Sequence, residues 1–320
     1  MIDITALGEI LIDFTYNGIS KDGQKLFEQN PGGAPANMLA SANKCGMKTA
    51  FVGKVGNDMH GEFMMETLKS AGIDTSNLLV DDSAFTTLAF VGIDANGERN
   101  FSFARKPGAD TLIKPEEVSL ELLKNSRVFH FGGLSLPDEP SASATRYAIQ
   151  KAKELGCIVT YDPNYRPSLW RDDVERAVRE MKEMIPHTDL MKVSDEELVL
   201  MTGQEDIEVG AKMLLAEGTT FLVVTLGGDG AYVCNASGGA YVAGYKSQVV
   251  DTTGAGDSFF GAFVSEFLKS GKKPEEITIA DGVEFARFGN AVASLCVEKR
   301  GGIPSMPEFS DSKARYETMK

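Results

Sequence analysis

Residues 251–257 read Asp251-Thr252-Thr253-Gly254-Ala255-Gly256-Asp257, and the apolar run Ser258-Phe259-Phe260-Gly261-Ala262-Phe263-Val264 follows directly. A glycine-rich segment that opens an amphipathic helix presents backbone N–H groups at the positive end of the helix dipole, which favours an anion. Gly254 and Gly256 let a phosphoryl group approach the backbone because neither has a side chain. A carboxylate at Asp257 can accept the proton of an attacking hydroxyl beside that anion. An aspartate is also common at any helix start, but the whole heptad favours the functional interpretation.

On both sides of this segment, short apolar runs alternate with longer amphipathic stretches. We expect strands at residues 4–14, 49–55, 87–93, 128–131, 158–161, 190–193 and 221–226, and helices at residues 35–45, 61–71, 141–155, 173–185, 208–217 and 256–270. This alternation is typical of an α/β fold with a mainly parallel central sheet flanked by helices on both faces. Two later runs, residues 231–234 and 240–243, predict a hairpin.

Two segments interrupt the alternation and contain no obvious helix. Residues 15–30 are polar, and residues 86–104 hold two strand-like runs around the turn Asp94-Ala95-Asn96-Gly97. Together they predict a small β-sheet lid, leaving residues 1–14, 31–85 and 105–320 as the large α/β domain. The alternative is that both segments are surface loops of the main domain. The polar residues from Glu308 onward are expected to fray.

The composition is that of an ordinary globular protein, with 42% apolar and 24% charged residues among 320. Its net charge of −14 argues against a nucleic-acid or anionic-membrane partner, since both favour a basic face. It does not argue against ATP, because Mg²⁺ masks much of the triphosphate charge.

The cysteines and the N-terminus indicate a cytoplasmic protein. Four cysteines lie far apart and three histidines accompany them, with no zinc-binding spacing, so buried thiols in a reducing compartment are expected. Asp3 and Glu9 interrupt the N-terminal apolar stretch, which therefore does not resemble a signal peptide. No apolar run approaches the roughly 18 residues of a membrane span. A Walker A sequence and a spaced G-x-G-x-x-G are both absent, which excludes P-loop enzymes and typical dinucleotide binders.

Four motifs resemble one family in order along nearly the whole chain. Residues 251–257 resemble the C-terminal signature of the ribokinase-like (PfkB) carbohydrate kinases, and Gly32-Gly33-Ala34-Pro35-Ala36-Asn37 resembles their N-terminal G-G-x-x-x-N. Asp162-Pro163-Asn164-Tyr165-Arg166, with Leu169-Trp170, resembles the D-x-N-x-R-x-x-L-W segment of the fructokinase branch. Residues 100–110 resemble that branch's F-x-F-x-R-x-P-x-A-D.

The resemblance implies a sheet of about nine strands flanked by helices, with a small β lid over the sugar. It implies transfer of the ATP γ-phosphoryl group to a sugar hydroxymethyl with Mg²⁺. Asp257 would be the base, and the N–H groups of Gly254, Ala255 and Gly256 the anion hole. Lid strands in this family can pair between subunits, so the resemblance allows a homodimer.

The acceptor sugar requires groups that reach two neighbouring hydroxyls. Asp13 and Asn37 suit this role, and Gly32 and Gly33 permit close backbone approach. The remaining candidates are Phe101, Arg105, Asn164 and Arg166, which without the motifs would be ordinary packing or loop residues.

The nucleotide side is predicted from three places. Lys192, Ser194 and Glu197 align with the family's N-x-x-E motif, whose glutamate acts on Mg²⁺ through water; Ser194 departs from the usual asparagine, and Glu197 is also a normal helix-capping choice. Thr225, Gly227 and Gly230 follow a buried strand and suit ribose and phosphate contacts. Asn290 matches the adenine-pocket position.

The resemblance also implies a K⁺ site. Its ligands would come from Asp251, Thr253, Gly301 and Ser305, with the Cys296 carbonyl beside them.

Among the activities of this family, the motifs favour a fructokinase. A 2-keto-3-deoxygluconate kinase would use Arg105 or Arg166 on the substrate carboxylate, and an aminoimidazole riboside or nucleoside kinase is a further alternative. A phosphofructokinase is disfavoured by the acidic charge and by the lack of a Lys/Arg cluster near the sugar motifs. A non-enzymatic sugar or nucleotide sensor is disfavoured because Asp257, the glycine pair and Glu197 are all present.

Overall fold

The structure is a computed structural model that describes residues 1–93 and 99–319, without the side chains of residues 93 and 99–101. The turn predicted at residues 94–97 lies outside the described residues.

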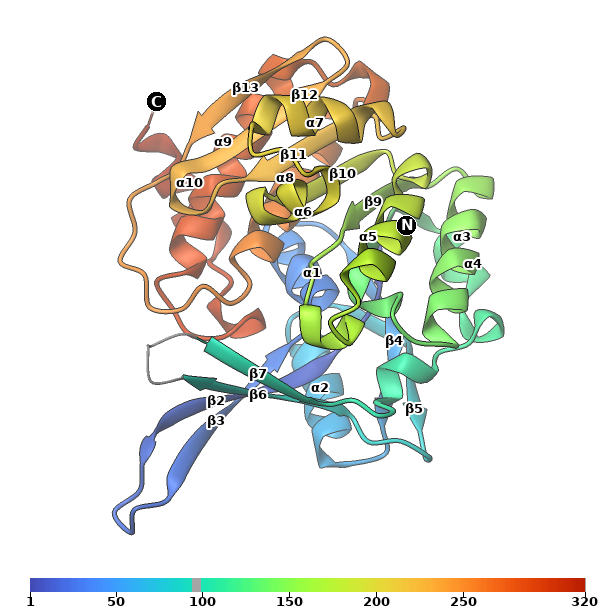
Figure 1. Cartoon of the computed structure of the whole chain (residues 1–320), viewed down its shortest axis with the longest axis vertical. Coiled ribbons are helices and arrows are strands. Elements are labelled where there is room, and N and C mark those ends of the chain that lie inside the picture. Colours follow the sequence, from blue (N-terminus) through green and yellow to red (C-terminus); the bar gives the residue numbers. More distant parts are fainter. Residues whose placement is uncertain (94–98, 320) are drawn as a thin grey trace.

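A nine-stranded sheet forms the centre of the larger part of the molecule, in the order β13-β12-β11-β10-β9-β8-β1-β4-β5 (Figure 1). Its strands are β1 Ile2–Leu7, β4 Thr49–Gly56, β5 Asp74–Asp81, β8 Ser126–Gly132, β9 Ile158–Asp162, β10 Leu190–Ser194, β11 Phe221–Thr225, β12 Gly230–Asn235 and β13 Gly238–Ala243. The pairings from β5 to β11 are parallel, whereas β11, β12 and β13 pair antiparallel. The predicted fold class and the predicted hairpin are confirmed.

Helices cover both faces of this sheet. One face packs against α1 Ala34–Lys44, α2 Met59–Ser70, α8 Ala255–Ser270 and α9 Ile279–Cys296. The other face packs against α3 Leu120–Lys124, α4 Ser141–Glu154, α5 Val174–Glu183, α6 Asp195–Thr202 and α7 Ile207–Ala216. Short 3-10 helices are η1 Ala109–Leu112, η2 Pro115–Glu117, η3 Gly133–Ser135, η4 Pro167–Trp170, η5 Ile185–His187, η6 Gly227–Asp229, η7 Pro274–Glu276 and η8 Ile303–Ser305. Each face of the sheet therefore has its own apolar core.

A second, four-stranded sheet has the order β3-β2-β6-β7 and extends from one end of the large sheet (Figure 1). Its strands are β2 Leu11–Ile19, β3 Lys25–Gly32, β6 Thr87–Ile93 and β7 Arg99–Ala104. Strand β2 pairs antiparallel with β3 and parallel with β6, and β6 pairs antiparallel with β7. The division into a large domain and a lid stays a prediction.

The prediction of one strand over residues 4–14 is wrong, because the chain changes sheets inside that run. Strand β1 ends at Leu7 in the large sheet, and β2 begins at Leu11 in the small one. A Cβ at Gly8 would lie 2.5 Å from Pro35 Cγ, so the chain passes close to α1 at this point. Because Ile10 and Ile12 are as buried as Ile4, the apolar pattern carries no sign of the break.

The expectation that the C-terminus frays is also wrong. Helix α10 spans Phe309–Glu317 and packs on α9, where the Tyr316 ring lies 5.9 Å from that of Phe288 in a T-shaped arrangement. Arg315 pairs with Glu298 at 3.2 Å. A mainly polar segment is thus held by aromatic contacts on one face.

Cys45, Cys157, Cys234 and Cys296 are buried and unpaired. Within the part of the chain that the structure describes, no helix has both the length and the apolar character needed to cross a membrane.

Candidate active site

The predicted site residues gather where parallel strands end and two helices begin. Asp162 ends β9, Ser194 ends β10 and Thr225 ends β11, while α1 and α8 start nearby. Ligand sites of open α/β sheets form at this carboxyl edge, since the loops there are free to diverge.

Asp257 lies in the first turn of α8, half-buried, with its carboxylate facing Asn37 of α1. Its Oδ2 accepts a hydrogen bond of 2.8 Å from Asn37 Nδ2. Burial raises the pKa of Asp257 to about 6, and the charge of Asp162 adds to this; Lys192, Asn37 and Arg166 act in the opposite direction. A carboxyl group with this pKa is ionised at neutral pH and remains able to take up a proton, as a general base requires.

The three backbone N–H groups that are expected to bind an anion differ in whether a protein atom already accepts from them. Gly254 caps α8 with a left-handed φ of 78°, which glycine adopts without strain. The N–H of Ala255 donates to Thr252 O at 3.2 Å, whereas no described protein atom accepts from the N–H of Gly254 or Gly256. The arrangement therefore offers two free amides at the start of α8.

The residues predicted for the acceptor lie around Asn37 and the start of α1. Gly33 caps α1 with φ 113°, and Asn37 N–H donates to Gly33 O at 2.9 Å. A Cβ at Gly32 would lie 2.4 Å from Asp13 Oδ2, which places that carboxylate beside the glycine pair. Asn37 Oδ1 is buried without a hydrogen-bond partner in the described structure. Sequence positions 13, 32, 33, 37 and 257 thus come together.

Asn164 and Arg166 lie in the loop after β9, next to Asp162. Asn164 has φ 43°, and its N–H donates to Asp162 Oδ1 at 3.1 Å. A positive φ in a residue other than glycine is uncommon and occurs often at functional sites. Arg166 Nη1 donates to Tyr165 O at 2.9 Å, and its charge acts on Asp257.

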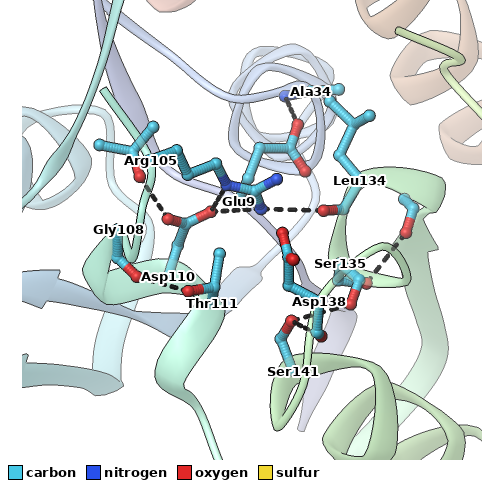
Figure 2. A network of polar contacts seen from close by, with 12 residues as sticks. Glu9, Ala34, Arg105, Gly108, Asp110, Thr111, Leu134, Ser135, Asp138 and Ser141 are labelled. Atoms are coloured by element: carbon cyan, nitrogen blue, oxygen red, sulfur yellow. Dashed lines mark hydrogen bonds and ion pairs between the residues drawn. The ribbon is translucent and has the colours of Figure 1, made fainter. Parts of the chain in front are cut away.

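Arg105 is largely occupied by other protein groups, as Figure 2 shows. Its Nε and Nη2 donate to Asp110 Oδ2 at 2.9 and 2.6 Å, and Nη2 also donates to Leu134 O at 2.8 Å. Only Nη1 is left, buried and without a hydrogen-bond partner among the described atoms. Arg105 can therefore donate hydrogen bonds to a ligand from one nitrogen, Nη1, and cannot bind it through two nitrogens. The side chain of Phe101 lies outside the described residues.

Glu9 belongs to the same network, although its sequence context did not mark it as a site residue. It lies between β1 and β2, and its Oε1 accepts from Ala34 N at 2.7 Å (Figure 2). Its Oε2 is buried without a hydrogen-bond partner in the described part of the chain and faces the Arg105 guanidinium. Burial raises the pKa of Glu9 to about 7. The sequence signal that could have marked Glu9 is its position as an acidic residue inside an apolar run.

The Glu9→Gln substitution is expected to change how stability depends on pH. The folded-state pKa of about 7 exceeds the reference value of 4.5, so the folded chain retains a proton that the unfolded chain releases. Wild-type stability should therefore fall as pH rises from about 4.5 to 7, by up to about 3 kcal/mol from this group. Urea unfolding of both proteins at pH 5 and 7.5 should show that the free energy of unfolding of the variant, relative to that of the wild type, is higher at pH 7.5 than at pH 5. A pH-independent difference would contradict this.

A pocket of about 390 Å³ opens between the end of β11, the segment after β13, the start of α8 and the C-terminal half of α9. Its lining includes six predicted residues, Thr225, Gly227, Gly230, Ala255, Gly256 and Asn290. Asn290 Nδ2 is bound to Val242 O and Ala243 O at 3.2 and 3.1 Å, so this amide also secures β13. Sequence reasoning missed Tyr245, Lys246, Phe259 and Val297, which carry no motif but line the same pocket. Its apolar wall and glycine rim suit a nucleotide base and its phosphates.

Glu197 connects two loops of the site. Its Oε1 accepts from Tyr165 N at 2.7 Å and its Oε2 from Ser194 N at 2.8 Å, while Ser194 Oγ accepts from Glu197 N at 3.1 Å. Among the described residues no group of three His, Cys, Asp or Glu side chains forms a metal cage. These residues fit a Mg²⁺ that is held mainly by phosphate and water, since that ion keeps several waters and few protein ligands.

The residues expected to hold K⁺ also converge. Asp251 Oδ1 accepts from Thr253 N and Oγ1 at 2.9 and 2.8 Å, and Asp251 Oδ2 accepts from Gly301 N at 3.0 Å. Ser305 Oγ lies 3.0 Å from Cys296 Sγ, and Cys296 Sγ lies 3.8 Å from Thr253 O. This oxygen-rich cluster beside the start of α8 fits a hard monovalent cation in its donor chemistry.

Comparison with known proteins gives a consistent result. Residues 1–308 match the pfkB family of carbohydrate kinases. The chain is 39% identical over 315 residues to Fructokinase-2 of Solanum lycopersicum, a match that covers 97% of this chain and 94% of that protein. The fructokinase of Vibrio cholerae O395, solved with fructose, ADP and calcium ion, has a TM-score of 0.88 at 30% identity and covers 98% of this chain and 99% of its own. The fructokinase of Xylella fastidiosa with bound ATP has a TM-score of 0.87 at 29% identity, covering 99% and 98%.

Proposed function

We propose that this chain, which belongs to the pfkB family of carbohydrate kinases, uses ATP to phosphorylate D-fructose to fructose 6-phosphate. The observation that carries the proposal is the position of Asp257. Its half-buried carboxylate lies between the pocket that Gly256 lines and the acceptor group around Asn37. The high identity to fructokinases over nearly the whole chain supports fructose among the sugars of the family.

In the proposed mechanism Asp257 takes the proton of the sugar hydroxymethyl as its oxygen attacks the γ-phosphorus. Asn37 orients the carboxylate through its 2.8 Å hydrogen bond. The free N–H groups of Gly254 and Gly256 hold the transferring phosphoryl group and stabilise its charge. Asp13, the glycine pair, Asn164, Arg166 and Arg105 Nη1 bind the remaining sugar oxygens. Positioning these groups beforehand lowers the entropy cost of the reaction.

On the nucleotide side, the proposed adenine contact is Asn290, and the loop from Thr225 to Gly230 follows the ribose and phosphates. Ser194 and Glu197 are proposed to face the phosphates, with Mg²⁺ neutralising their charge when it is bound. Asp251, Thr253, Gly301 and Ser305 would hold K⁺ next to the anion hole. A cytoplasmic location and a homodimer stay predictions.

The proposal is tested by an acceptor panel. ADP release should be measured with fructose, ribose, 2-keto-3-deoxygluconate, an aminoimidazole riboside and fructose 6-phosphate, with and without K⁺. We expect kcat/KM for fructose to exceed that of every other acceptor by about tenfold or more, a difference of about 1.4 kcal/mol in transition-state binding. Preference for the keto acid would identify the neighbouring activity instead. Binding of a sugar without ADP release would favour a sensor.

A further inference from the structure

The segment that follows β13 forms one wall of the pocket of about 390 Å³. Residues 244–250 belong to no helix or strand, and we call residues 245–249 the wall segment. The pocket is lined by four of its residues, and by Ser294 of α9 as well; the four are Tyr245, Lys246, Ser247 and Val249. Because a loop has no ladder of hydrogen bonds of its own, the shape of this wall depends on contacts with other segments.

Both ends of the wall segment are fixed by backbone hydrogen bonds. At its start, Gly244 N donates to Asp229 O at 3.1 Å. At its end, Val250 N and Asp251 N donate to Val297 O at 2.8 and 3.2 Å. The heptad that begins at Asp251 is therefore anchored on the end of α9 directly, and not through the wall segment.

The middle of the wall segment is held by α10, the C-terminal helix that the sequence predicted to fray. Arg315 Nη1 donates to Lys246 O at 3.3 Å and to Ser294 Oγ at 3.1 Å. The hydroxyl of Tyr245 donates to Tyr316 O at 3.1 Å. Two consecutive residues of α10 thus bind three residues that line the pocket.

Glu298 binds the second terminal nitrogen of the Arg315 guanidinium. Arg315 Nη2 donates to Glu298 Oε1 and Oε2 at 3.2 and 3.3 Å, and Glu298 Oε1 also accepts from Gln248 N at 3.4 Å. The Arg315 side chain is 22% exposed, so solvent screens this pair only in part. One planar guanidinium therefore joins α10 to α9 and to the wall segment, which the single nitrogen of a lysine cannot do.

The docking of α10 does not depend on Arg315 alone. Phe309 at its start and Tyr316 near its end both pack against the Phe288 ring of α9, with ring centroids 5.9 Å apart in each pair. The Lys269 ammonium lies 4.7 Å from the centre of the Phe309 ring. Since these contacts anchor the helix, loss of the Arg315 guanidinium should release the wall segment while α10 stays in place.

We propose that Arg315 is a positioning residue for the nucleotide, which holds the wall segment of the pocket in its binding conformation from α10. This inference rests on the proposed function, because it takes the pocket to be the ATP site. A loop that is already ordered loses less conformational freedom when its ligand binds, so the affinity is higher. Because the heptad is anchored through Val297, Arg315 acts on nucleotide affinity and not on the transfer step.

Titration calorimetry with ADP and Mg²⁺ tests the effect on affinity. Arg315→Met should bind ADP about tenfold more weakly than wild type, and Arg315→Lys, which keeps the charge beside Glu298, should lie between the two. The matched control is Arg127→Met, at the start of β8 and thus at the opposite edge of the sheet. Arg127 likewise joins a carboxylate, Asp3 at 3.2 Å, to a carbonyl, Leu268 O at 3.2 Å. Its loss should leave ADP affinity unchanged.

Steady-state kinetics separate positioning from a general loss of structure. In Arg315→Met the KM for ATP should rise about tenfold, while kcat and the KM for fructose stay within about twofold of wild type. Unchanged ADP affinity in the folded Arg315→Met protein would overturn the inference. An equal rise of both KM values would also overturn it, because it would show that the whole site has loosened.

Amide hydrogen exchange of the peptide that covers residues 244–250 measures the cause. Without nucleotide, these amides should exchange faster in Arg315→Met than in wild type, and bound ADP should restore part of the protection. Equal exchange in the two proteins would overturn the inference. If these effects appear in a protein that does not turn over fructose, the inference holds and the proposed acceptor is rejected. Fructose turnover with the same ADP affinity in every variant rejects the inference and keeps the proposed function.

Discussion

The Asp257→Asn variant is expected to lose about 10³-fold in kcat while it keeps its fold and both ligands. General-base catalysis by a positioned carboxylate contributes about 10²- to 10⁴-fold. Asparagine keeps an oxygen that can accept from Asn37 Nδ2 but cannot take up the sugar proton. The substitution also removes a carboxyl group whose ionisation is disfavoured by partial burial, so the free energy of unfolding should not decrease.

The pH profile gives the sharper form of this prediction. Wild-type kcat/KM for fructose should decline below pH about 6, because protonation of Asp257 removes the base. The residual activity of Asp257→Asn should lack this decline. Steady-state kinetics from pH 5 to 9, with thermal unfolding of each protein, measure both effects.

Asp281→Asn is a matched control, because Asp281 also lies in the first turn of a helix. It accepts from Thr278 N at 2.9 Å at the start of α9, in an ordinary capping box. Its loss should reduce stability by about 1 kcal/mol and leave kcat unchanged. If Asp257→Asn behaved in the same way, with kcat within a few-fold of wild type, Asp257 would be a helix cap and the assignment of the base would be wrong.

The Gly33→Ala variant is expected to lose roughly 3 kcal/mol or more of stability, since both backbone strain and a clash oppose it. Gly33 has φ 113°, and a Cβ there would lie 2.4 Å from Glu9 O and 3.0 Å from Ile10 Cα. Both of those atoms belong to backbone where the chain passes from the large sheet to the small one. The clash can therefore be relieved only by moving α1 away from that connection, which also displaces Asn37.

Gly46→Ala separates strain from clash. Gly46 has φ 91°, but no atom lies within 4 Å of its Cβ position. It should cost only about 1 kcal/mol, the penalty of a left-handed conformation. Urea unfolding measures both variants, and KM for fructose should rise only in Gly33→Ala. Equal losses of stability in the two would show that the close contact at Glu9 is not rigid.

Sequence patterns predicted helix boundaries closely, because such boundaries depend on residues that are neighbours in the chain. The helix predicted at residues 35–45 is Ala34–Lys44 in the structure, and that at residues 256–270 is Ala255–Ser270. Periodicity and glycine positions are sufficient for such boundaries. They failed at Gly8, where two buried strands of different sheets follow one another, and at α10, whose polar sequence is held by contacts with Phe288.

In the site, too, the motifs identified residue types, whereas the contacts between these residues came from the tertiary structure. The motifs identified Asp257, Asn37 and the glycine pair as chemically important, but the hydrogen bond between Asn37 and Asp257 joins residues 220 positions apart. Arg105 had the right chemistry for a substrate, yet Asp110 and Leu134 occupy most of its donors. Tyr245 and Phe259 line the proposed nucleotide pocket without any motif. Such facts depend on which distant side chains compete for the same space.

By itself, the sequence determined the α/β pattern and an anion site with a neighbouring carboxylate, because periodicity and glycine positions are local properties of the chain; the sugar kinase activity followed from the resemblance of its motifs to a family. Only the tertiary structure decided which groups are buried together. That burial raises the pKa of Asp257 to about 6, leaves two amides free at the start of α8, and places the Lys192 ammonium beside them. The physical reason is that the strength of a charge or a hydrogen bond depends on its desolvation and its neighbours, and both are set by contacts between distant parts of the chain.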